Sequence, residues 1–244
     1  MTMLTLNSSG SAQGIRIPAP LSMVGLSVAW IRAVAFTVPA LFLAAVLLQP
    51  WVEPKWMFLD PLTAAELSGD CCHVYYGFVS NLGVMLWSAT AAVCLLAAAV
   101  FAMQRRQGPL VWFALSAGAL TGWLALDDAF LLHELVLPSL GVPQNAVLTA
   151  YLVLGGTYAI ASWRMILASD YLVLVVGAAA MAVSIGVDTV FHSLLPALVS
   201  LEDSAKFFGI FCWAAFHIST MAALLASPQV VLQRRGAAGQ GGRP

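Results

Sequence analysis

Charged side chains are scarce in this 244-residue sequence: they make up 9% of the residues, whereas 61% are hydrophobic. A soluble domain carries roughly a quarter charged residues, so this composition excludes an ordinary soluble globular protein. The formal net charge of -1 and the lack of a long basic run give no indication of nucleic-acid binding. Four cysteines without a C-x-x-C motif do not make a disulfide framework. Phosphate-loop, dinucleotide and haem-attachment motifs are absent as well.

Long apolar runs account for most of the chain. Six of them predict membrane-spanning helices, at about 25–49, 77–103, 110–135, 146–166, 169–196 and 205–227. Each run is long enough to cross a hydrocarbon core of about 30 Å. The sequence therefore predicts an all-α integral membrane protein, a bundle of six transmembrane helices within residues 25–227. Residues 1–24 and 228–244 are expected to be disordered cytoplasmic segments.

The basic residues indicate how the predicted bundle is oriented. One set of alternating loops carries most of the arginines: Arg16, Arg105, Arg106, Arg164, Arg234 and Arg235. The other set is mainly acidic. Because basic loops stay in the cytoplasm, both termini are predicted to be cytoplasmic, in a multi-pass protein of a bacterial-type inner (plasma) membrane.

Four ionisable residues, Asp127, Asp128, His133 and Glu134, lie inside the third predicted span. Such side chains are costly in a membrane unless they pair, bind a metal or line a wet cavity. The predicted topology places them in the outer half of the bundle. Other helices contribute polar residues at the same depth: Ser80, Asn81, Gln144, Asn145, Asp188, His192, Glu202, Asp203 and Lys206. The sequence thus predicts one polar layer near the outer leaflet.

Residue spacing suggests which members of this layer meet. Asp188 and His192, four apart, share a helix face, where they can bind one metal ion or the carboxylate can simply orient the imidazole. Asp128 and His133, five apart, do not share a face unless the helix is distorted.

Three further expectations concern the other ionisable residues of the spans. Asp127 and Glu134, seven apart, share a face. Lys206 is placed to pair with Glu202, four residues earlier, or to neutralise Asp188 on the neighbouring helix. The deeper His217 is expected to be a hydrogen-bonded core histidine.

Histidine and carboxylate side chains at one depth suit three kinds of chemistry. They bind borderline metals such as iron, zinc or copper. They also relay protons, or activate water for hydrolysis.

The stretch YLVLVVGAAAMAVSIGVDTVFHSLLPALVSLEDSAKFFGIFCWAAF resembles the C-type subunit of the copper-containing membrane monooxygenases, which oxidise methane, ammonia or short hydrocarbons. On that pattern Asp188 takes the position of an Asn and His192 that of a matching His, while Lys206 replaces a second His. LDDAFLLHE is similar to the family's Asp-x3-His metal motif, with Asp128-x4-His133 here. Asn145 in GVPQN replaces the next His ligand.

This resemblance implies a divergent subunit of a membrane oxidoreductase that works with other membrane subunits. It implies metal ligation by Asp128 and His133 at one site and by Asp188 and His192 at another. Additional ligands or surrounding groups would be Asp127, Glu134, Asn145, Glu202 and Lys206. The implied metal is copper, with iron, zinc or no metal left open because Asn145 and Lys206 replace histidines.

Three alternatives stay open at this point. One is a non-catalytic structural subunit in which Asp188 and Lys206 form an ion pair. Another is a proton-coupled transporter. The third is a zinc-dependent membrane hydrolase, since WAAFHIST is similar to the last helix of alkaline ceramidase-type hydrolases.

Overall fold

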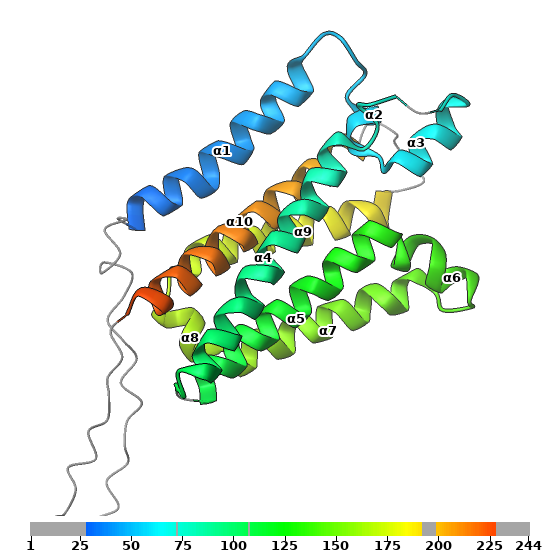
Figure 1. Ribbon diagram of the computed structural model, residues 1–244. Helices are drawn as coiled ribbons and strands as arrows, with labels where there is room; N and C mark the ends of the chain where they lie inside the picture. The colour runs from blue at the N-terminus through cyan, green and yellow to red at the C-terminus, as the bar shows by residue number, and fades with distance from the viewer. Residues whose placement is uncertain (1–27, 72, 107, 192–198, 228–244) are drawn as a thin grey trace, which may run out of the picture.

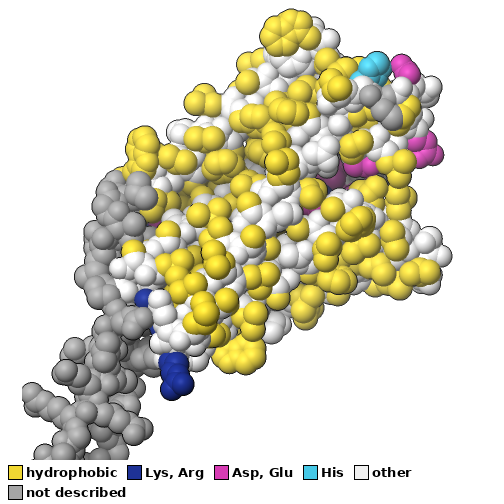
Figure 2. All heavy atoms as spheres, viewed as in Figure 1, with side chains coloured by type: hydrophobic (Ala, Val, Ile, Leu, Met, Phe, Trp, Pro, Cys, Tyr) yellow, Lys and Arg dark blue, Asp and Glu magenta, His cyan; other side chains and the backbone are white. Residues whose placement is uncertain are grey.

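The computed structural model describes residues 28–71, 73–106, 108–191 and 199–227, and this part of the chain is helical, without a strand (Figure 1). Five of its helices are long and apolar enough to cross a membrane: α1 (Val28–Leu48), α4 (Phe78–Met103), α5 (Gly108–Phe130), α9 (Tyr171–Phe191) and α10 (Val199–Ala226). Large apolar side chains such as Leu48 and Ile160 lie on the molecular surface, where hydrophobic side chains predominate (Figure 2). Lipid covers a surface of this kind, so the chain is a multi-pass membrane protein.

The fourth predicted span differs from the sequence prediction. Residues 146–166 do not form one helix: α7 (Gln144–Ala161) ends before Ser162, and α8 (Trp163–Ala168) follows it. Helix α7 starts with two amides, Gln144 and Asn145, and is not among the five helices that are long and apolar enough to cross a membrane. A six-span bundle therefore stays a prediction, and the predicted terminal segments lie outside the described residues.

Helix α10 is central to the packing of the described bundle. It contacts α9, α4 and α1, and α4 packs along α5. The largest apolar cluster joins α4, α5 and α10 through buried side chains that include Phe101, Phe113, Phe216 and Met221. His217 packs against Phe113 and Phe216 of this cluster and is fully buried. Its Nε2 is 2.8 Å from the Tyr158 hydroxyl and its Nδ1 is 2.9 Å from the Trp213 carbonyl, which confirms the prediction of a hydrogen-bonded core histidine.

Two glycines allow α9 and α10 to approach closely. A Cβ atom at Gly177 would lie 2.7 Å from the Cβ of Cys212 and 3.2 Å from the Gly209 carbonyl oxygen. A Cβ atom at Gly209 would lie 3.0 Å from the Gly177 carbonyl oxygen. Both positions are therefore restricted to glycine by backbone proximity, as is common where membrane helices pack through small residues.

Gly177→Ala is expected to lower the thermal stability of the purified protein in detergent. The added methyl group must push α9 and α10 apart, and overpacking of this kind costs about 1–3 kcal/mol. Gly186→Ala on the same helix is the matched control, because a Cβ atom there meets nothing within 4 Å. Equal melting temperatures for the two variants would contradict the close contact.

Charges of opposite sign collect at the two ends of the bundle (Figure 2). The basic end, where α1 begins and α10 ends (Figure 1), carries Arg32, Arg105, Arg106 and Arg164. The acidic end, where α5 ends and α10 begins, carries every described carboxylate side chain except Asp170. Among the described residues, arginines and carboxylates are thus largely segregated to opposite ends of the bundle.

Asp170 is the exception because it binds Arg32. The Arg32 guanidinium donates through Nε and Nη2 to both carboxylate oxygens, at 2.8–3.1 Å. The Asp170 side chain is 2% exposed, so its charge depends on this partner. The ion pair ties the start of α1 to the start of α9.

Arg32→Gln is expected to lower the melting temperature of the purified protein in detergent, because it leaves the buried Asp170 carboxylate without its cationic partner. Arg164→Gln is the matched control at the same end, because Arg164 stacks on its own neighbour Trp163. A smaller loss of stability for Arg32→Gln than for the control would show that the ion pair does not hold α1 in place.

Candidate metal centre

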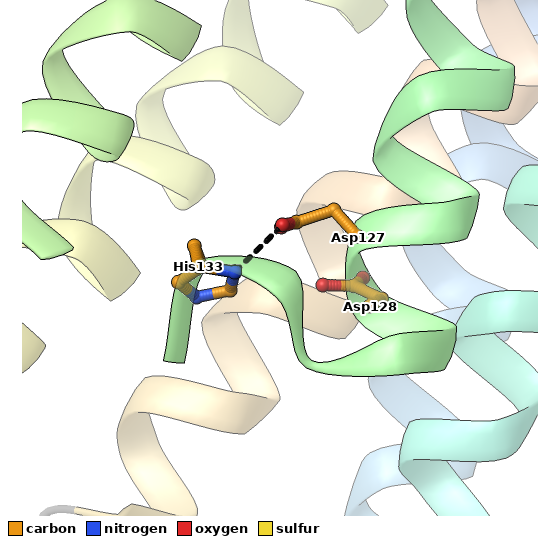
Figure 3. Close-up of side chains that lie close together, drawn as sticks. All are labelled: Asp127, Asp128 and His133. Atoms are coloured by element: carbon orange, nitrogen blue, oxygen red, sulfur yellow. Dashed lines mark hydrogen bonds and ion pairs between the residues drawn. The ribbon is translucent and has the colours of Figure 1, made fainter. Parts of the chain in front are cut away.

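The chain changes direction immediately after α5. Leu131 has φ 50° and ψ 44°, a left-handed conformation that is unfavourable for a residue with a Cβ atom. A π-helical turn, η2 (Leu132–Val136), and the short α6 (Leu137–Ser139) follow. Figure 3 shows that this path brings His133 back toward Asp127 and Asp128 on the last turn of α5. The left-handed Leu131 is thus the helix distortion that Asp128 and His133 need in order to lie close together.

Asp127 is the direct partner of His133. Its Oδ2 lies 2.5 Å from His133 Nδ1, and its Oδ1 accepts the His133 backbone N–H at 3.0 Å. The Tyr151 hydroxyl of α7 also donates to Oδ1, at 2.7 Å. Asp127 is 2% exposed, and these three donors compensate for the burial of its carboxylate.

The contact with Asp127 also determines the tautomer and the orientation of the His133 ring. Since an ionised carboxylate only accepts hydrogen bonds, Nδ1 carries the proton and Nε2 points elsewhere. Burial opposes protonation of the ring, but the hydrogen bond and negative charge of Asp127 outweigh it and raise the pKa of His133 above its ordinary value. Nε2 lies 3.4 Å from an oxygen of the exposed Glu134.

Asp128 faces a different set of partners. Its Oδ2 accepts the indole N–H of Trp87 at 3.0 Å, and its Oδ1 lies 2.9 Å from the Lys206 ammonium of α10. The ion pair joins α5 to α10, and the Trp87 bond joins α5 to α4. Asp128 therefore connects three helices at the acidic end.

Together these residues form a group with the composition of a metal site. Asp127, Asp128 and His133 each offer a ligand atom, and these atoms all lie within 4.8 Å of one another. An imidazole with carboxylates suits divalent transition metals. A carboxylate oxygen has more than one lone pair, so an oxygen that accepts a hydrogen bond can still bind a cation.

The three residues lie at the wall of a cavity of about 380 Å³. Helices α5, α7, α9 and α10 contribute to its lining, and the segment of α2 (Lys55–Phe58) and α3 (Pro61–Ser68) adds Phe58, Leu59, Asp60 and Thr63. Asp60 also caps α3 by accepting the N–H groups of Leu62 and Thr63. Figure 2 shows acidic side chains gathered at this end of an otherwise apolar surface.

The other residues predicted for the site do not belong to the group of Asp127, Asp128 and His133. Asp188 and Glu202 line the cavity, and Asp188 accepts a hydrogen bond from the Gln144 amide of α7 at 3.3 Å. The ion pair of Lys206 is with Asp128 rather than with either of these acids. His192 lies outside the described residues, so its predicted pairing with Asp188 is not described.

Two sequence expectations were wrong in detail. Asn145 is exposed and does not line the cavity, because α7 turns its neighbour Gln144 inward instead. The shared helix face expected for Asp127 and Glu134 is also not formed by a regular helix, because the left-handed Leu131 lies between them, and Asp127 binds His133.

Trp87, Tyr151 and Ser184 belong to the cavity but were not singled out from the sequence. A periodic signal for two of them exists. Trp87 is seven residues after Ser80, and Tyr151 is seven after Gln144, so each lies two turns along the same helix face as a polar residue. Ser184 is likewise four residues before Asp188.

Cys71 and His73 lie at the same end of the molecule but do not offer a second metal site. Cys71 is disulfide-bonded, so its sulfur is not a thiolate. His73 instead contacts Asp70, with Nε2 3.1 Å from the carboxylate.

Most of the chain matches the model of a known protein family. The model of a family described as a domain of unknown function, DUF8692, matches residues 30–220. No curated protein and no solved structure matches the chain.

Proposed function

We propose that this chain, which belongs to the DUF8692 family, binds a divalent transition-metal ion at the wall of its acidic-end cavity. The observation that supports this most strongly is the convergence of His133 with two carboxylates within 4.8 Å beside a cavity of about 380 Å³. A metal ion offsets the cost of concentrating carboxylates at the end of a membrane bundle.

In this proposal the residues have distinct roles. His133 binds the ion through Nε2, and Asp128 supplies a carboxylate oxygen. Asp127 holds the imidazole in the required tautomer, as a carboxylate does behind many metal-bound histidines, and also lies close enough to bind directly. Lys206 lowers the negative charge that attracts the ion.

We further propose that the metal serves redox chemistry, with the chain acting as one subunit of a monooxygenase-type membrane oxidoreductase. The resemblance to the C-type subunit of the copper monooxygenases supports this part, and the ligand set suits copper or iron. In the proposed topology the chain crosses the membrane six times with both termini in the cytoplasm. The basic end then faces the cytoplasm and the site lies near the outer leaflet.

Elemental analysis of the purified protein tests the proposal. About one copper or iron ion per chain is expected, retained through size-exclusion chromatography in detergent. Zinc at the same ratio would instead favour metal-activated hydrolysis, in which the ion lowers the pKa of a bound water. No metal above the buffer background, even after incubation with copper, iron or zinc salts, would contradict metal binding.

A structural role is the second candidate, because Asp128 already has partners. Its ion pair with Lys206 and its bond from Trp87 join α5, α10 and α4 without any metal. A protein with no bound metal that depends on Lys206 for stability would support this alternative.

A further inference from the structure

The cavity is larger than a metal ion needs. A volume of about 380 Å³ falls within the range of sites for small organic ligands, about 300–1,000 Å³. Asp127, Asp128 and His133 occupy one part of its wall. Another part is formed by α9 and α10, with Ser184, Asp188 and Asp203 among its polar side chains. Space for a second occupant therefore remains beside the proposed metal.

The charge of the lining selects the class of that occupant. Seven carboxylates line the cavity, and the cationic groups among its described lining residues are the Lys206 ammonium and, when protonated, the His133 imidazole. Lys206 is committed to Asp128 at 2.9 Å. Acidic side chains therefore outnumber basic ones in the described lining, and such a lining favours cations over anions such as carboxylates and phosphates.

Ser184 provides independent support for a ligand. It is 6% exposed and lines the cavity, and its hydroxyl makes no hydrogen bond with any residue in the described part of the chain. A hydroxyl in a buried residue normally has a partner, and Ser184 belongs to the lining of the cavity, where a ligand can supply one. Asp188 lies one turn further along α9, on the same face. Hydroxyl and carboxylate oxygens so arranged are acceptors for an ammonium group, which only donates.

The rest of the lining is apolar. Leu124, Leu148, Met181 and Ile185 contribute hydrocarbon surface, and Trp87 and Tyr151 contribute aromatic rings. An ion without a hydrocarbon part would leave this surface facing water. The complementary ligand is therefore a cation that also carries an alkyl group.

We propose that the cavity binds an alkylammonium ion, with its nitrogen between Ser184, Asp188 and Asp203 and its hydrocarbon part against the apolar wall. This inference rests on the proposed function for its location and names the class of substrate or ligand for the same cavity. It does not require the metal to be present.

Calorimetric titration of the whole protein in detergent tests the proposal, with butylammonium chloride as the probe. Butanol and butyrate have a hydrocarbon part of similar length and serve as the neutral and anionic comparisons. The titration is made on chelator-treated protein and again after metal loading. We expect the ammonium to bind at least about tenfold more tightly than butanol, and butyrate not to bind. Equal affinities for the ammonium and the alcohol would overturn the proposal.

Variants locate the ammonium group. Asp188→Asn and Asp203→Asn are each expected to weaken butylammonium binding about tenfold, and Ser184→Ala about threefold. Glu66→Gln is the matched control, because it removes an exposed charge of α3 at the same end but outside the cavity lining. A loss of affinity as large for Glu66→Gln as for Asp188→Asn would show general charge attraction instead of a site.

The two proposals fail separately. Ammonium binding in metal-free protein, with no metal retained, would remove the metal centre but keep this ligand class. If the protein retains a metal but does not prefer butylammonium over butanol, the metal centre stands and the alkylammonium ligand is excluded.

Discussion

His133→Ala is expected to reduce the affinity for the bound metal by at least about a hundredfold, and so to yield protein that purifies nearly metal-free. His133 supplies the imidazole in the group of Asp127, Asp128 and His133, and Asp127 orients this ring. The alanine variant has no ring to orient. Changes in groups that only orient a ligand already cost about 10–100-fold in metal affinity, so the loss of the ligand itself costs more. Metal content per chain and competition with a chelator measure the effect.

His73→Ala is the matched control for this variant. His73 also contacts an aspartate, Asp70 at 3.1 Å, but it is exposed and does not line the cavity. Its metal content should equal that of the unmodified protein. Asp127→Asn should give an intermediate affinity, because the amide still holds the ring without its charge. Full metal content in His133→Ala would exclude His133 as a ligand.

Lys206→Gln is expected to increase the affinity for a divalent metal by about tenfold or more. The ammonium lies 2.9 Å from Asp128 Oδ1 and competes with any cation for that carboxylate. Two unit charges about 4 Å apart interact by about 4 kcal/mol at an effective dielectric constant of 20, and solvent and relaxation reduce this value. Metal titration of chelator-treated protein measures the change.

Lys55→Gln controls for the loss of one positive charge at the acidic end. Lys55 pairs with the exposed Glu53 at 2.9 Å and does not line the cavity. Its metal affinity should therefore change little. If Lys206→Gln instead melts at a markedly lower temperature and gains no affinity, the Asp128–Lys206 pair is structural and the scaffold alternative is favoured.

Much of the fold follows from apolar runs in the sequence. The long helices α1, α4, α5, α9 and α10 match five of the six predicted spans, because twenty or so apolar residues have few other stable conformations in lipid. The run at 146–166 was less informative. Composition does not reveal that helix geometry is interrupted at Ser162, where α7 gives way to α8.

The candidate site was predictable in position but not in pairing. Topology placed Asp128, Asp188 and Lys206 at one depth, and the structure finds all three in the lining of one cavity. Which residues they pair with depends on how each helix is rotated about its own axis and on the φ angle of Leu131. Leu131 gives no sequence signal of a positive φ, since glycine or asparagine is usual there, yet it determines that His133 meets Asp127.

The glycine contact between α9 and α10 has a consequence for ligand affinity. Ser184 lies seven residues beyond Gly177 on α9, and Asp203 lies six residues before Gly209 on α10, so both are about 10 Å from the contact. The spacing of these two parts of the cavity wall is thus set by the close approach of α9 and α10 at the two glycines. Relatives that differ in size at position 177 or 209 should differ in the width of the ligands they accept, even where every cavity-lining side chain is identical.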